Sequence, residues 1–293
     1  MTTRGVLIAT EPFGASELIE LVRGVESRGY DSVWLPELFG REPIATAGVL
    51  LARTERIAVG TAIANVYVRD AAAMAQAHRT LAELSGGRFI LGLGVSNARL
   101  NESRGHTWHT PVVKMTAYLD ALAKARIDSP APAATAPVLV AAHGPRLQRL
   151  AAEKADGVIT YLMPPEHTAQ SRARIGDVAL APVAFFLAER DPAVARRKAR
   201  GALRVYIQLD YYHREWRKLG FADADFADGG SDALIDQLVA WGDERALQDR
   251  IAAFERAGAS RVIVLPLGLR TKEGIDWRVL DALAVTKGVR PLS

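Results

Sequence analysis

The sequence predicts an α/β protein built as one (β/α)8 TIM barrel over residues 1–293, and three observations carry this prediction. Short apolar or β-branched runs alternate with segments whose apolar residues recur three or four positions apart, which is typical of βαβ units on a parallel sheet. There are eight such runs, the number of strands in a closed barrel. Several helical segments end at a glycine just before the next strand. An open, doubly wound sheet is the alternative.

The predicted elements follow in order along the chain. The strand candidates are residues 4–10, 32–36, 56–63, 88–94, 137–142, 157–162, 180–188 and 261–268. The clearest amphipathic helices between them are residues 15–30, 71–87 and 243–259, and Gly29, Gly86 and Gly258 stand where C-cap glycines are expected. A longer helical stretch is expected from Asp191 to Leu219.

Two segments interrupt the alternation without dividing the chain into domains. Residues 128–137 form a loop rich in Pro and Ala, and residues 221–232 form an acidic connection that contains adjacent glycines. A strand of the same sheet follows each of them. We therefore expect a single domain.

Composition excludes several classes of protein. With 49% hydrophobic and 24% charged residues, the chain has the composition of a globular protein. Its zero Cys residues exclude disulfides and thiolate nucleophiles, which fits the cytoplasm, and we find neither a signal peptide nor an apolar run of membrane-spanning length. The net charge of +4 comes mostly from dispersed Arg; residues 189–204 are denser but have the spacing of a solvated helix face. We therefore expect a cytoplasmic protein that binds neither nucleic acid nor membrane. Its ligand is expected to be a small molecule, and the excess of positive charge is compatible with an anionic one.

We expect no metal site. His106 and His109 stand three residues apart, but no carboxylate accompanies them at a recognisable spacing. His78 lies inside an amphipathic segment, where packing explains it better than ligation. The motifs of P-loop proteins, of serine hydrolases and of zinc proteases do not occur.

The barrel prediction itself selects candidate site residues, because chemistry in such barrels occurs at the carboxyl ends of the strands. The polar residues at these ends are Glu11, Glu37, Asn65, Ser96, Asn97, His143, Tyr161, Glu189 and Arg270. Glu37 is open to three interpretations: a solvated loop acid, a structural ion pair or a contact with a cofactor. Residues 143–147 begin a helix directly after the fifth strand, with Pro145 suited to its first turn. Free N–H groups there would suit a phosphate, with Arg146 adding charge, although an ordinary helix start explains the pattern equally well.

The glycines of the segment SGGRFILGLGVS do not match a dinucleotide-binding fingerprint. That fingerprint needs a third glycine where Asn97 stands, and it follows the first strand of a fold rather than the fourth. We expect Gly92 and Gly94 instead to thin the barrel wall, so that a flat ligand lies close to the backbone.

The chain resembles the bacterial luciferase-like flavin and deazaflavin oxidoreductases along nearly its whole length. The resemblance rests on the order and spacing of GYDSVWLPE, TERIAVGTAIANVYVRD, LSGGRFILGLG, VLVAAHGPRLQRLAAEKADGVIT and GDERALQDRIAAFERAGASRVIVLPLG. It is strongest to the branch that uses coenzyme F420. The resemblance implies a homodimeric enzyme that transfers a hydride between the deazaflavin C5 and a small organic substrate. An FMN-dependent monooxygenase and a non-catalytic flavin-binding barrel are the alternatives.

The resemblance also implies positions for the cofactor. A non-proline cis peptide would fall at Ala62–Ile63, and Glu37 would tune ring protonation or relay a proton. Cofactor contacts are implied for Glu37, Ala62, Ile63, Asn65, Gly94, Val95, Ser96 and Asn97, with the phosphate on Ala141, Ala142, His143 and Gly144.

Four features depart from the family pattern. Glu37-Leu38 stands where many relatives have Asp-His, and Val95 stands where the sugar-phosphate dehydrogenase branch has an acid, so we do not expect that activity. His143 replaces a small residue beside the implied phosphate. The insertion that relatives carry between strands 4 and 5 is shortened here to residues 128–137, which we expect to leave the mouth of the barrel, at the carboxyl ends of the strands, more open.

Aromatic residues in 209–216 could line a pocket or a dimer face, or pack in the core.

Overall fold

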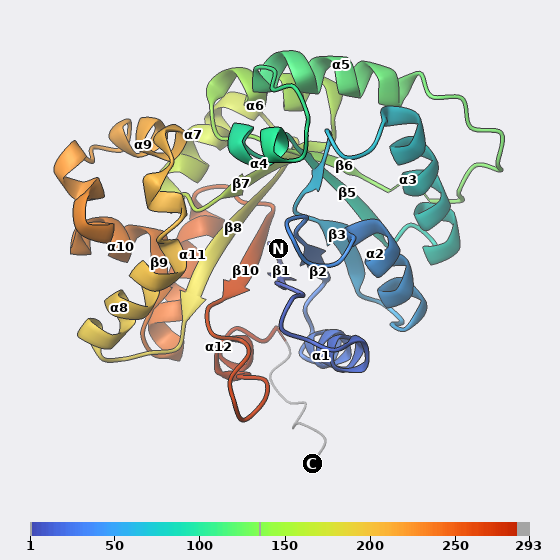
Figure 1. Ribbon diagram of the computed structural model, residues 1–293. Helices are drawn as coiled ribbons and strands as arrows, with labels where there is room; N and C mark the ends of the chain where they lie inside the picture. The colour runs from blue at the N-terminus through green and yellow to red at the C-terminus, as the bar shows by residue number, and fades with distance from the viewer. Residues whose placement is uncertain (1, 135, 286–293) are drawn as a thin grey trace.

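Eight parallel strands close into a barrel in the computed structural model, which describes residues 2–134 and 136–285 (Figure 1). The barrel strands are β1 (Thr3–Leu7), β2 (Ser32–Leu35), β3 (Ala58–Thr61), β5 (Phe89–Gly94), β6 (Val138–Ala141), β7 (Gly157–Tyr161), β8 (Ala179–Leu187) and β10 (Arg261–Pro266). Strand β10 pairs with β1 on one side and with β8 on the other, which closes the sheet. All eight predicted strands are confirmed, and closure excludes the open sheet.

Two short strands were not predicted. β4 (Ala64–Asn65) pairs with β5, and β9 (Val239–Trp241) pairs with β8. A strand of two residues has no detectable alternation, and β9 follows a helix without an intervening turn residue. Neither strand belongs to the closed ring of eight.

Helices surround the barrel (Figure 1). They are α1 (Ala15–Ser27), α2 (Pro43–Ala52), α3 (Ala71–Ser85), α4 (Ala98–Ser103), α5 (Pro111–Ala123), α6 (Pro145–Lys154), α7 (Pro165–Ile175), α8 (Pro192–Leu203), α9 (Asp210–Arg217), α10 (Asp232–Leu238), α11 (Glu244–Arg256) and α12 (Arg278–Ala282), with 3-10 helices η1 (Tyr206–Gln208) and η2 (Asp223–Gly229). The three predicted amphipathic helices are confirmed as α1, α3 and α11. Their glycines Gly29, Gly86 and Gly258 have φ of 80°, 64° and 91°, as C-caps require.

The long helix expected from Asp191 to Leu219 is wrong. The chain forms α8, turns through η1 and starts again as α9, with Leu209 in an extended conformation between them. Ile207 of η1 is buried in the same apolar cluster as Tyr212 and Trp216 of α9. Tertiary burial of these side chains therefore overrides the local helical pattern.

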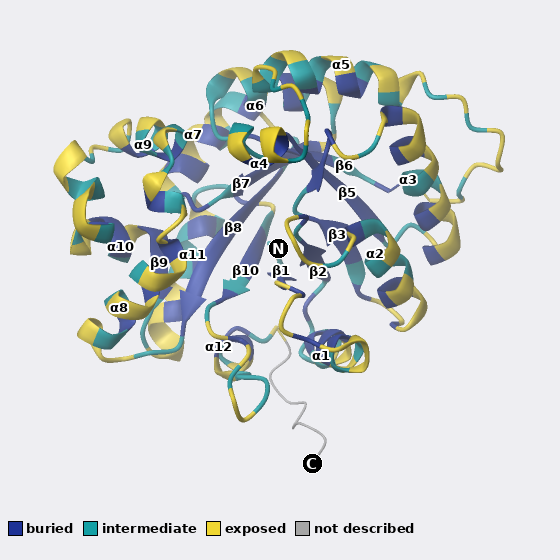
Figure 2. Ribbon diagram, viewed as in Figure 1, coloured by how far each residue is buried: buried dark blue, intermediate teal, exposed yellow. Residues whose placement is uncertain are grey.

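Burial follows two layers, the barrel interior and the space between barrel and helices (Figure 2). The interior is filled by Leu7, Trp34, Ile90, Leu139, Ile159, Ala181, Val183 and Ile263. Trp34 is fully buried, and it fits because a Cβ at Gly5 or Gly60 would lie only 2.5 or 2.6 Å from its indole. The interior is thus a packed core rather than a pore, so a ligand of the barrel has to bind at one of its ends.

The short connection 128–137 does not lie at the mouth. It leads from α5 into β6, so it belongs to the amino end of that strand. Its residues Pro130 and Ala136 accept hydrogen bonds from Arg79 Nε (3.1 Å) and His78 Nε2 (2.9 Å) of α3. The expectation that this segment opens the mouth is therefore wrong.

Candidate active site at the carboxyl ends of the strands

The backbone is strained at two points where strands end. Ser96, just after β5, and Leu162, just after β7, have φ of 57° and 56°. A non-glycine residue in the left-handed region costs on the order of 1–3 kcal/mol and persists only where its surroundings hold it there, which is common at functional sites. Both residues lie at the end of the barrel that the strand rule selects.

The glycines of β5 make room for β3. A Cβ at Gly92 would lie 1.9 Å from the carbonyl oxygen of Thr61, and one at Gly94 would lie 2.5 Å from Cγ1 of Ile63. The Thr61 hydroxyl bonds both the Gly92 carbonyl (2.7 Å) and its N–H (2.9 Å). The space above these glycines is therefore taken by the neighbouring strand, which corrects the expectation that it admits a ligand. As the resemblance implied, the Ala62–Ile63 peptide bond is cis.

An apolar surface closes the barrel interior toward the mouth. Five partly buried residues pack on the interior core from the strand ends, namely Ala62, Ile63, Ala141, Tyr161 and Leu265. Three of the implied cofactor positions are among them. Val95 and Ala142, by contrast, belong to the cluster that packs against the helices, so their side chains face away from the barrel interior.

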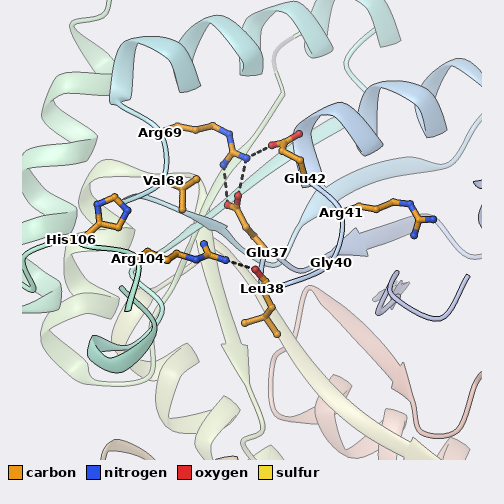
Figure 3. A pocket seen from close by; sticks show the side chains of 9 residues that line it. All are labelled: Glu37, Leu38, Gly40, Arg41, Glu42, Val68, Arg69, Arg104 and His106. Carbon is orange, nitrogen blue, oxygen red and sulfur yellow. Dashed lines mark hydrogen bonds and ion pairs between the residues drawn. The ribbon is translucent and has the colours of Figure 1, made fainter. Parts of the chain in front are cut away.

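Glu37 is held in an ion pair. Its carboxylate accepts two hydrogen bonds from Arg69 (2.8 and 2.9 Å) and one from the N–H of Asn65 (2.8 Å), and it is 8% exposed. Glu42, at the start of α2, also bonds Arg69 (Figure 3). Burial alone would lower the pKa of Arg69, but the bonds and charges of the two glutamates outweigh it and raise that pKa. The ion pair is thus the interpretation of Glu37 that the structure shows directly.

A cavity of about 380 Å³ opens beside this ion pair. It is lined by Glu37, Leu38, Gly40, Arg41, Glu42, Val68, Arg69, Arg104 and His106 (Figure 3). Arg41 points away from the Glu37–Arg69 pair and donates to the carbonyls of Thr10 (2.5 Å) and Phe13 (2.6 Å). Arg104 donates to the carbonyl of Leu38. The cavity is therefore lined mainly by charged side chains, and its apolar lining residues are Leu38 in the loop after β2 and Val68 in the loop after β4.

The side chain of Asn65 is buried and bonded within the protein. It donates to Asn101 Oδ1 (2.9 Å) and accepts from the N–H of Tyr67 (3.1 Å), and it is fully buried. Asn101 in turn donates to the carbonyls of Val95 (2.8 Å) and Asn97 (3.0 Å). The Asn97 side chain caps α4. Asn101 and Arg69 were not identified from the sequence, because neither directly follows a predicted strand.

The start of α6 has no side-chain cap, but a carboxylate lies beside it. Oε1 of Glu215, which pairs with Lys218, would be 3.6 Å from a Cβ at Gly144. Gly144 is the N-cap, Pro145 is the first helical residue, and no side chain caps the helix. Within the described residues, the first-turn N–H groups of Arg146 and Leu147 donate to no protein group. These groups and the helix dipole suit a phosphate.

The His143 ring turns toward β7. Its Nε2 accepts a hydrogen bond from the N–H of Tyr161 (3.1 Å), so the ring proton sits on Nδ1. Burial, helped by the nearby His167, lowers the pKa of His143 to about 3. The imidazole is therefore neutral at physiological pH and adds no positive charge to the helix start.

Aromatic residues cover the ends of β6 and β7. The insertion between β8 and β9 supplies Tyr206, Tyr211, Tyr212 and Trp216. Trp216 Nε1 donates to the Leu162 carbonyl (3.4 Å), and the Tyr211 ring stacks beside His143 at 6.3 Å. Of the interpretations for residues 209–216, core packing is confirmed for Tyr212 and Trp216, which are 2% and 0% exposed. Tyr211 stays half-buried at the mouth.

Metal and membrane features are missing from the described part of the chain. No three His, Asp or Glu side chains gather there in an arrangement that could hold a metal ion, and the His106 ring lies 5.9 Å from that of Tyr67 instead. Across residues 2–134 and 136–285, no helix has the length and apolar character needed to cross a membrane.

Comparisons with known proteins agree on one family. The family model described as luciferase-like monooxygenase matches residues 1–261. A 5,10-methylenetetrahydromethanopterin reductase of Methanolobus tindarius is 31% identical over 151 residues, 46% of each chain, so this match spans about half of that relative. A putative coenzyme F420-dependent oxidoreductase of Mycobacterium tuberculosis is 24% identical and covers 84% of this chain and 89% of its own. The structure of an F420-dependent secondary alcohol dehydrogenase superposes with a TM-score of 0.75 at 16% identity, covering 97% and 98% of the two chains.

Proposed function

The chain belongs to the luciferase-like monooxygenase family, and on that premise we propose that it is a coenzyme F420-dependent oxidoreductase acting on a small organic substrate. The observation that carries the proposal is the pairing of two features at one end of the barrel. These are the apolar surface around Ile63 and the uncapped start of α6 at Gly144. A deazaflavin offers a flat tricyclic ring and a phosphate, one for each feature.

The described residues fit such a group. Ala62, Ile63 and Ala141 present apolar atoms at the barrel mouth, as contact with a flat ring requires. The N–H groups of Arg146 and Leu147 would hold the phosphate. When bound, the deazaflavin supplies a carbon that gives or accepts a hydride. The protein then has to orient the reactants and exclude water.

In this proposal Glu37 mainly holds the site in shape. Its carboxylate ties Arg69 on one loop to the N–H of Asn65 on β4, next to the Ala62–Ile63 bond. Both oxygens already accept bonds from these donors, so a relay through Glu37 would require breaking part of the ion pair. A contact between Glu37 and the cofactor, and its role in relaying a proton, remain predictions.

Cofactor binding tests the proposal directly. Purified protein is titrated with F420 while the fluorescence of the deazaflavin and the thermal stability of the protein are followed. We expect quenching and a rise in Tm. FMN is titrated in parallel, because it also carries a tricyclic ring and a phosphate. Tighter binding of FMN would favour the monooxygenase alternative, and no response to either cofactor would refute the proposal.

We also propose that the chain forms a homodimer through α2 and α3. Helix α2 has ten residues and no charged side chain, and its Val49 is 51% exposed. Gly48 packs against Leu81 of α3, one turn before Leu84, which is 78% exposed. An uncharged surface helix with exposed apolar residues is typical of an interface, and a second copy presents the same surface.

A further inference from the structure

Two tyrosines form a hydroxyl pair at the mouth. Tyr161 is the last residue of β7, and its side chain continues the inward-facing series of Ile159. Tyr206 comes from η1 in the insertion that covers this end of the barrel. Their hydroxyl oxygens are 2.9 Å apart. The pair thus reaches from the covering insertion to the apolar surface where the ring is proposed to lie.

One phenolic proton of the pair is left over. Only one of the two O–H groups can be used in their mutual bond, and the other meets no acceptor among the described residues. Burial raises the pKa of Tyr161 well above its usual value and raises that of Tyr206. Both phenols are therefore protonated at neutral pH, and one proton is free for a ligand.

Two other titratable groups at the mouth, Glu37 and His143, are poor proton donors. The Glu37 carboxylate only accepts, from Arg69 and from Asn65. His143 accepts from the N–H of Tyr161 and is neutral, with a pKa of about 3. A carbonyl oxygen on the apolar surface would thus find no effective proton donor in Glu37 or His143, whereas the inward-facing Tyr161 of that surface carries a phenolic proton.

We propose that Tyr161 donates its phenolic proton to the carbonyl oxygen of an aldehyde or ketone substrate, and that Tyr206 positions Tyr161 by donating a hydrogen bond to its oxygen. The inference rests on the proposed function, which supplies reduced deazaflavin as the reductant. The carbonyl carbon receives the hydride, the C–O π bond breaks, and its electron pair takes the Tyr161 proton. The alcohol forms, the deazaflavin is oxidised, and Tyr161 recovers a proton from Tyr206, which recovers one from water.

Binding to the cofactor-free protein gives the first test. The probe is 4-dimethylaminocinnamaldehyde, whose absorption moves to longer wavelength when its carbonyl oxygen accepts a hydrogen bond. We expect this red shift with the wild type, its loss with Y161F, and a smaller shift with Y206F. Tyr30→Phe is the matched control, because it removes a buried hydroxyl at the other end of the barrel, where Tyr30 bonds the Leu280 carbonyl at 2.9 Å. No shift in the wild type, or a full shift in Y161F, would overturn the proposal.

Turnover of the same aldehyde with reduced F420 gives the second test. We expect Y161F to lose kcat about a hundredfold or more, with a small change in KM, and to lose the solvent deuterium isotope effect on kcat. The kcat of Y206F should lie between those of the wild type and Y161F. This second variant also keeps the test decisive if Y161F does not fold. If F420 does not bind, the proposed function fails while the probe still tests the pair. If F420 binds and Y161F keeps the wild-type kcat, the tyrosine inference fails alone.

Discussion

Single residues decide the chemistry at the mouth, and Glu37 shows how. Its position after a predicted strand marked it as a site residue, but its partner Arg69 is 32 residues away along the chain. Sequence spacing cannot show such a pairing, because it depends on how the loops fold back. The contact of Gly92 with Thr61 was hidden for the same reason. The residues that follow a strand, such as Glu37, were therefore predictable, whereas their bonding and the partners that other segments supply, such as Arg69, were not.

Replacement of Glu37 by Gln should lower the free energy of unfolding, because the main role of Glu37 in the proposal is structural. The Gln amide has one acceptor oxygen and no charge, whereas both oxygens of the Glu37 carboxylate accept hydrogen bonds. The loss of a hydrogen bond to a charged group lowers the free energy of unfolding by about 2 kcal/mol. We expect the free energy of unfolding in urea to fall by that amount. Glu42→Gln is the control, because Glu42 is exposed and bonds the same arginine. Glu42 also caps α2, and the Gln amide oxygen can still accept from the N–H groups there, so this substitution should cost less than about 1 kcal/mol. Equal effects would contradict a structural role for Glu37.

Substitution at Gly144 separates helix capping from cofactor binding. Gly144→Asp places a carboxylate that can accept from the first-turn N–H groups of α6, but the neighbouring Glu215 carboxylate repels it, so we expect only a small change in Tm. The same carboxylate should weaken F420 binding at least about tenfold by occupying those groups and repelling a phosphate. Gly144→Asn tests capping without charge and should weaken binding less. Gly201→Asp is a control on another helix, α8, at an exposed glycine with open space around its Cβ. Undiminished binding by G144D would place the phosphate elsewhere.

At the scale of elements, strands were easier to predict than their surroundings. Barrel strands are buried on both faces and are apolar enough to stand out. β4 and β9 were too short, and the break between α8 and α9 arises from burial of Ile207 and Tyr212 rather than from a local signal. The order of elements was therefore correct, while the insertion at the mouth was not resolved.

The α2 and α3 surface gives the prediction at this scale. Val49→Asp or Leu84→Asp places a charge in the proposed interface and should convert a dimer into a folded monomer. Sedimentation velocity measures the change. Val113→Asp on α5 is the matched control, since Val113 is 62% exposed and lies outside this surface. A wild-type monomer, or dimers with V49D and L84D, would refute the proposed interface.

At the scale of the whole molecule, stability should depend on His143 in weakly acidic solution. The folded-state pKa of about 3 lies below the usual value of 6.5, so the unfolded chain binds the proton more readily. The stabilisation by neutral His143 is therefore complete above pH 6.5 and is lost as the pH falls, by up to about 1.4 kcal/mol per unit.

His143→Gln keeps an acceptor for the Tyr161 N–H and removes this titration. Urea unfolding of both proteins from pH 7 to pH 4.5 should therefore show a shallower decline for H143Q. Since the carboxylates and the remaining histidines titrate alike in the two proteins, the difference in slope isolates His143. Parallel curves would show that the ring can take up a proton in the folded state.

The clamp between Thr61 and Gly92 has a consequence for changing this protein by directed evolution. A side chain at Gly92 would collide with the backbone carbonyl of Thr61 at 1.9 Å, so no side-chain substitution on β3 can make room for it. The insertion from residue 188 to residue 238 meets the mouth through side chains such as Tyr206 and Tyr211, which single substitutions can reshape. Libraries for new substrates should therefore diversify the insertion and leave the two clamped strands as they are.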